Sequence, residues 1–109
     1  MKFKDLQKLD QDIIMALSSH KGIDRAIHGK TLAQSLKIDL RTLQSRIEFL
    51  QRNHCAIGSV VNQGYFIPLN EEERRAGIIK KMKSGIAINS AVNGYMVADI
   101  NWLNELIGG

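Results

Sequence analysis

The chain has 109 residues, of which 44% are hydrophobic and 24% are charged, and its formal net charge is +4. A chain of this length can bury a modest core as one domain, and no apolar run reaches the ~18 residues of a membrane-spanning helix. The opening residues, MKFKDLQKLDQD, lack the apolar stretch of a secretion signal. The single cysteine, Cys55, excludes a disulfide framework and a cysteine-rich metal site. We therefore expect a cytoplasmic protein without a membrane segment.

The net positive charge is confined to the first two thirds of the chain. Residues 1–69 hold ten Lys and Arg against six Asp and Glu, a net of +4, whereas residues 70–109 hold five of each. This excess is consistent with a polyanionic partner, although many solvated surfaces carry a similar charge and bind nothing.

Apolar spacing and capping residues predict three helices in this basic part. From Phe3 to Ser18, apolar residues recur every three or four positions, which marks one face of a helix. Thr31 is suited to begin a short second helix, which ends in a tight turn at Lys37. Asp39 is a suitable N-cap for a third helix, from Leu40 to Asn53.

A β-hairpin is predicted after the third helix. Residues 56–61 and 65–67 are rich in β-branched and aromatic side chains, which favours two strands. Asn62-Gln63-Gly64 between them suits a hairpin loop, because Asn and Gly tolerate a positive φ. Pro68, the only proline, ends the second strand.

Two further helices are predicted in the last forty residues. Asn70 is suited to cap a helix over residues 71–83, in which the acidic residues come first and the basic ones last. From about Ile86 to Ile107 the sequence predicts a last helix that is apolar on most of its surface. Such a helix packs across the first helix or pairs with another chain.

This order of elements resembles the winged helix-turn-helix superfamily. The motifs that carry the resemblance are T-L-A-x-x-L-x-I from Thr31, R-T-L-Q-x-x-I-x-x-L from Arg41, and G-Y-F-I-P from Gly64. They are similar to motifs in the N-terminal domains of biotin-ligase repressors and DeoR-type regulators, and in small prophage-type winged-helix proteins. The resemblance covers residues 10–72. Two departures are Lys37 at a turn position commonly held by glycine, and a wing tip without Lys or Arg.

The resemblance implies a mainly α fold with a small β-hairpin. Residues 1–69 would form a winged helix-turn-helix domain, and residues 70–109 would form a C-terminal helical extension.

In such a domain the exposed side of the third helix enters the major groove of DNA. Arg and Gln contact the edges of guanine and adenine there, and Thr and Ser bond bases or phosphates. The residues so placed are Arg41, Thr42, Gln44 and Ser45. An ordinary polar helix face is the alternative, and Asp39 and Glu48 would repel phosphates. For Arg46, a structural salt bridge explains its position as well as a DNA contact does.

Two smaller groups complete the predicted DNA contacts. Lys30, Thr31 and Lys37 flank the second helix, whose N-terminus suits a phosphate, although capping by Thr31 explains its position equally well. Asn62 and Gln63 at the wing tip are candidates for the minor groove or the DNA backbone, although turn chemistry is the favoured explanation.

The apolar last helix predicts a homodimer. Its interface residues would be Ile88, Val92, Tyr95, Met96, Ile100, Leu103 and Leu106. No nucleophile with a base, no nucleotide-binding motif and no metal-ligand spacing of histidines occurs, so we expect neither an enzyme nor a cofactor or metal. The predicted function is sequence-specific binding of double-stranded DNA by a dimeric transcriptional regulator. The alternative is a protein-interaction module, a phage-type factor that docks on a host or replication protein without DNA readout.

Overall fold

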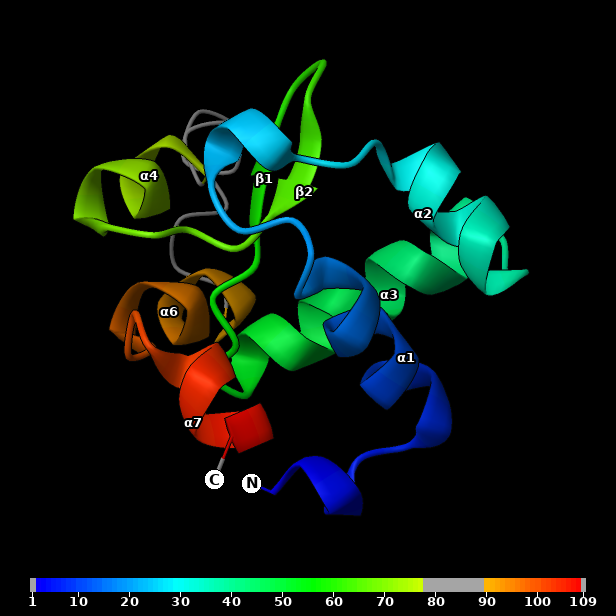
Figure 1. The fold of residues 1–109 in the computed structure, drawn as a ribbon, viewed down its shortest axis with the longest axis horizontal. Coiled ribbons are helices and arrows are strands. Elements are labelled where there is room, and N and C mark those ends of the chain that lie inside the picture. Colours follow the sequence, from blue (N-terminus) through cyan, green and yellow to red (C-terminus); the bar gives the residue numbers. More distant parts are fainter. Residues whose placement is uncertain (1, 78–89, 109) are drawn as a thin grey trace.

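The computed structural model describes residues 2–77 and 90–108 as helices around one antiparallel hairpin (Figure 1). The first helices are α1 (Lys8–Leu17), α2 (Gly29–Leu36) and α3 (Leu40–Arg52), and one-turn 3-10 helices lie at Phe3–Asp5 and Ile23–Arg25. The strands are β1 (Gly58–Val60) and β2 (Gly64–Phe66). They are followed by α4 (Glu71–Ala76), α6 (Ser90–Val97) and α7 (Trp102–Gly108). The predicted fold class, mainly α with a small β-hairpin, is confirmed.

The turn between α2 and α3 contains a residue in the left-handed helical conformation. Lys37 ends α2 with φ 59° and ψ 41°, the conformation for which glycine is the usual residue. Asp39 then caps α3, as predicted, and its carboxylate accepts a hydrogen bond from the backbone N–H of Thr42 at 2.6 Å. The predicted start of α2 is wrong, because His28 is the N-cap and Thr31 already lies inside the helix.

The hairpin is shorter than its apolar sequence suggests. The register pairs Gly58 with Phe66, Ser59 with Tyr65, and Val60 with Gly64. Residues 55–57, although β-branched or small, leave α3 as a buried loop and do not join the ladder. The side chains of these three residues are buried in the core. The hairpin therefore begins directly after this buried loop, at Gly58.

The predicted single helix over residues 86–107 is wrong in its second half. α6 ends at Val97 and α7 begins at Trp102. The Asp99 carboxylate accepts a hydrogen bond from the N–H of Asn101 at 2.9 Å, and the Asp99 carbonyl accepts one from the N–H of Trp102 at 2.9 Å. A short acidic side chain that bonds the backbone two residues on favours such a break. Residues 86–89 lie outside the described residues.

The C-terminal helices complete the core of the N-terminal ones. α6 packs along α3, as Figure 1 shows, and Gly94 lies where a Cβ would come within 2.1 Å of the Gln51 carbonyl oxygen. Trp102 is buried and donates from Nε1 to the carbonyl of Ala56 at 3.2 Å. Tyr95, Trp102 and Leu103 therefore share one apolar core with α1 and α3.

α4 is tied to α6 by polar groups. Arg74 is buried and donates to the carbonyl of Met96 at 2.6 Å, while the Tyr95 hydroxyl donates to the carbonyl of Arg74 at 2.7 Å. The predicted cap is confirmed, because Asn70 accepts from the N–H of Glu73 at 2.9 Å. Past Gly77 the predicted helix over residues 71–83 lies outside the described residues. Within the described ranges, no helix is long and apolar enough to cross a membrane.

Candidate nucleic-acid interface

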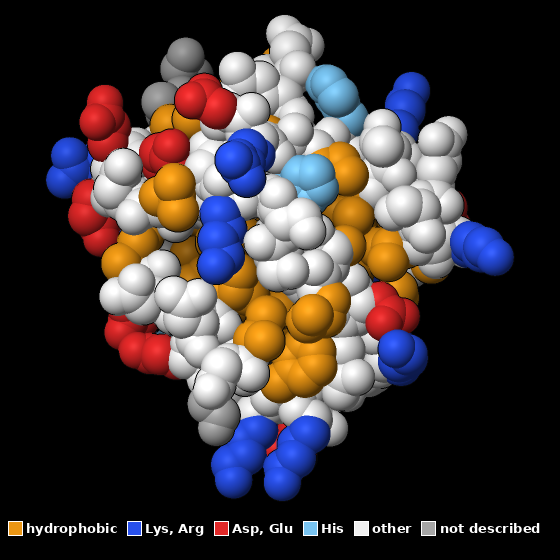
Figure 2. All heavy atoms as spheres, viewed as in Figure 1, with side chains coloured by type: hydrophobic (Ala, Val, Ile, Leu, Met, Phe, Trp, Pro, Cys, Tyr) orange, Lys and Arg blue, Asp and Glu red, His pale blue; other side chains and the backbone are white. Residues whose placement is uncertain are grey.

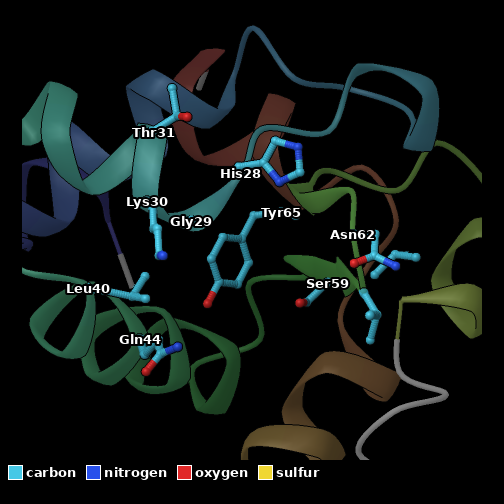
Figure 3. Close-up of a pocket in the computed structure, with 12 residues that line it drawn as sticks. His28, Gly29, Lys30, Thr31, Leu40, Gln44, Ser59, Asn62 and Tyr65 are labelled. Carbon is cyan, nitrogen blue, oxygen red and sulfur yellow. The ribbon is translucent and has the colours of Figure 1, made fainter.

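An open cleft of about 590 Å³ separates the helical pair α2 and α3 from the hairpin. The start of α2 and the first turns of α3 form one wall, and both strands with their loop form the other (Figure 3). The predicted contact residues that line it are Lys30, Thr31, Gln44 and Asn62. The cleft thus joins three of the separately predicted groups: the second helix, the third helix and the wing tip.

The two walls are held together by backbone hydrogen bonds. Ile27, just before α2, exchanges both bonds with Tyr65 of β2, at 2.9 and 2.8 Å. The N–H of Gly22 donates to the carbonyl of Ile67 at 2.8 Å, which extends the same contact. The segment before α2 therefore occupies the outer edge of β2, and the hairpin cannot swing away from α2 without breaking these bonds.

Close packing at Gly29 fixes the floor of the cleft. A Cβ at this position would lie 3.0 Å from Leu40 and 3.2 Å from the Tyr65 ring. The Tyr65 ring is half-buried, and this burial raises the pKa of its phenol. Its hydroxyl, like that of an ordinary tyrosine, is protonated at neutral pH and can donate a hydrogen bond.

The remaining predicted contact residues lie around the cleft and do not line it. Arg41 and Ser45 are exposed on α3, and Lys37 and Gln63 are exposed in the turn and the hairpin loop. Thr42 is half-buried, and its N–H is already used by the Asp39 cap. The predicted residues therefore do not form one continuous pocket.

The charges near the start of α3 are mixed. Hydrogen bonds from Thr42, and after them the positive charge of Arg41, lower the pKa of Asp39. Asp39 is therefore ionised at neutral pH and offsets part of the charge of Arg41. In Figure 2 several acidic side chains lie over α4 and others lie at the left, right and bottom edges, while Lys and Arg side chains are spread over the visible face, including the edge occupied by α2.

Arg46 has a structural role. Its guanidinium donates from Nε to Asp10 at 2.8 Å and from Nη2 to the second carboxylate oxygen at 2.5 Å. Asp10 is only 1% exposed, so this two-bond pair links α1 to α3 inside the protein. The hydrogen bond that Arg46 donates to Asp10 raises the pKa of Arg46, whose guanidinium carbon also lies 4.4 Å from the centre of the Phe49 ring. The salt-bridge interpretation of Arg46 is confirmed.

The sequence prediction missed Tyr65, His28 and Ser59 among the residues that line the cleft. For Tyr65 a signal was present. Side chains alternate between the two faces of a strand, and the neighbouring Phe66 is fully buried. The aromatic residue next to it must therefore lie on the opposite face of the strand, where Tyr65 lines the cleft and packs against the edge of the core. His28 and Ser59 carry no comparable signal.

The residues of the predicted dimer interface are divided by the structure. Tyr95 and Leu103 are buried in the chain's own core and are therefore not available to a partner chain. Met96 is 41% exposed, whereas Ile100 and Leu106 are half-buried. Ile88 and the side chain of Val92 lie outside the described residues. The dimer itself stays a prediction.

Comparison of the chain with protein-family models, with curated proteins and with solved structures found no match. In the described part of the chain, no group of three or more His, Cys, Asp or Glu side chains is placed to hold a metal ion.

Proposed function

We propose that this chain is a cytoplasmic winged helix-turn-helix protein that binds double-stranded DNA sequence-specifically as a transcriptional regulator. One observation carries the proposal: polar side chains surround the cleft, and the backbone that bears them is held in place. Among the described residues, the side chains of Lys30, Gln44 and Tyr65 make no hydrogen bond or ion pair, so their polar atoms are free to meet a ligand.

The exposed face of α3 supports the base-reading role. Arg41 and Gln44 are three positions apart, so they project from the same side of the helix. An α-helix about 10–12 Å wide fits a major groove about 12 Å wide. In that position Arg41 would bind a guanine edge and Gln44 an adenine edge, each through two hydrogen bonds.

The test is a selection from random duplex DNA, followed by titration of the selected site at two salt concentrations. We expect affinity to fall steeply with salt, because phosphate contacts release bound cations. The double variant Arg41→Ala, Gln44→Ala should lose roughly 30-fold or more in affinity for the selected site, at about 1–3 kcal/mol for each good base contact. Binding to unrelated duplexes should change much less.

Arg75→Ala is the matched control for the loss of one positive charge, because Arg75 is exposed on α4, away from the cleft. It should bind the selected site nearly as tightly as the native chain. If no duplex is selected, or if the double variant binds as tightly as the control, the proposal fails.

The same titration tests the dimer. A dimer would occupy a two-fold related site with two chains, whereas a monomer would bind with one. On the described part of α6, the apolar surface left for such contact is Met96 together with Val97, which is 58% exposed. A one-to-one complex that persists at high protein concentration would remove the dimer from the proposal.

One observation favours the alternative, a protein-interaction module. The wing tip carries no Lys or Arg, and its Val61 is 55% exposed. An apolar, uncharged tip suits contact with another protein better than contact with phosphates. Recovery of one stoichiometric protein partner, lost in Val61→Glu but retained in Arg41→Ala, would support this alternative.

A further inference from the structure

The cleft has a defined place on DNA if the proposed function holds, and the following inference rests on that function. In a duplex, one sugar–phosphate backbone separates the major groove from the adjoining minor groove. With α3 in the major groove, the hairpin beside it lies across that backbone. The side of the cleft formed by the hairpin would therefore face phosphates, whereas Gln44 on the α3 side would face base edges.

The groups at the centre of the cleft suit a phosphate. Tyr65 extends from β2 towards α3, with Lys30 and Gln44 on one side and Ser59 on the other (Figure 3). Ammonium, phenol and hydroxyl groups are among the usual partners of DNA phosphates. The described residues offer the Tyr65 hydroxyl no internal hydrogen-bond partner, although its ring is firmly packed against Gly29.

We propose that Tyr65 is a positioning residue whose hydroxyl, together with the Lys30 ammonium, holds one backbone phosphate and thereby sets the depth of α3 in the major groove. The backbone of Tyr65 is bonded to Ile27, two residues from the start of α2. A phosphate held here is thus fixed relative to both the hairpin and α2. The contact would raise affinity for every sequence and would not choose between bases.

The two ligands differ in charge, which makes their roles separable. The Lys30 ammonium replaces a cation on the phosphate, so its loss should reduce the slope of log affinity against log salt by about 0.9. The Tyr65 phenol is neutral, so its loss should leave that slope unchanged. Loss of a residue with a merely structural role would not lower the affinity in one variant and the salt slope in the other.

The experiment compares Tyr65→Phe, Lys30→Gln and the double variant with the native chain, on the selected duplex and on unrelated duplexes. Tyr65→Phe should lose about tenfold in affinity on all duplexes, since a hydrogen bond to a charged group is removed. Lys30→Gln should lose affinity with the reduced salt slope. The double variant should lose less than the product of the two single losses, because both groups act on the same phosphate.

Tyr65→Phe keeps the ring, and an unchanged urea midpoint will show that the fold is intact. Three results overturn the inference: native affinity in Tyr65→Phe, a loss restricted to one base position, or strictly multiplicative losses in the double variant. Suppose that the native chain selects a duplex and that the double variant Arg41→Ala, Gln44→Ala loses this selectivity. If Tyr65→Phe then binds with native affinity, only the inference about Tyr65 has failed. If the native chain selects no duplex, both it and the proposed function have failed.

Discussion

At the scale of single residues, Gly64 occupies the tightest position in the hairpin. Its φ is +104°, and a Cβ there would lie 2.0 Å from the carbonyl oxygen of Ile27. Both the left-handed backbone and the close approach of the segment before α2 therefore require glycine. This residue allows the hairpin and α2 to be bonded together.

Gly64→Ala should destabilise the fold by about 2–3 kcal/mol or more, because the backbone must move away from Ile27 and the strained φ remains. The measurement is the urea midpoint at constant m-value. Gly108→Ala is the control, since nothing lies within 4 Å of a Cβ at that position. Equal midpoints for the two variants would contradict this account of the hairpin.

The sequence predicted part of this residue-scale detail. Asn62 and Gly64 were expected to tolerate positive φ, and both adopt it, at 69° and 104°. The contact between Gly64 and Ile27 was not predictable, because no local pattern states which distant segment pairs with a strand. The burial of Asp10 against Arg46 was missed for the same reason, because the two residues are 36 positions apart in the sequence.

At the scale of elements, the N-terminus of α3 combines stability and binding. Asp39 caps the helix through Thr42, but its negative charge lies beside Arg41. The same carboxylate therefore stabilises the helix and opposes the approach of a phosphate. A change that keeps the cap and removes the charge separates the two effects.

Asp39→Asn should bind DNA about two- to fivefold more tightly than the native chain at low salt, because one repelled charge is removed. In the folded chain the pKa of Asp39 lies below its usual 3.8. The ionised carboxylate therefore stabilises the fold fully above pH 3.8. This contribution is lost as the pH falls through the lower, folded-state pKa. Acid unfolding of Asp39→Asn should lack this component. Asp39→Ala, in contrast, should also lower the melting temperature at neutral pH, because the cap is lost.

Element order was predictable, but the ends of the elements were less so. Caps at Asp39 and Asn70 were identified because a side chain within three residues supplies the bond. The interruption between α6 and α7 was missed, because apolar residues continue on both sides of Asp99. Periodicity cannot locate a break when both helices face the same core. The side chains that meet in the cleft were not predictable either, because they are brought together by the packing of the helices against the hairpin.

At the scale of the whole molecule, the C-terminal helices are part of the core. Trp102 and Leu103 of α7 and Tyr95 of α6 are buried against residues of the first half, and Trp102 bonds the carbonyl of Ala56. The division into residues 1–69 and 70–109 therefore cuts through one core.

A fragment of residues 1–69 should fail to fold cooperatively, because Ala56, which bonds Trp102, and the side of α3 that contacts α6 would face water. Dispersion of amide signals in NMR and a cooperative thermal transition are the measurements. Trp102→Phe in the full chain is the control; it keeps a buried ring and should lose about 1–2 kcal/mol, mostly for the unpaired Ala56 carbonyl. A fragment that melts cooperatively would show that the first 69 residues form an independent domain.

The contact of α7 with the first half also bears on the folding rate. Lys21 bonds Asn104 at 3.3 Å across 83 positions, and Trp102 reaches Ala56 across 46. Mainly helical proteins usually fold fast because their contacts are local, whereas contacts between distant segments require loop closure first. This chain should therefore refold more slowly than a helical bundle of its size. Trp102, the only tryptophan, would report the slow step by its fluorescence.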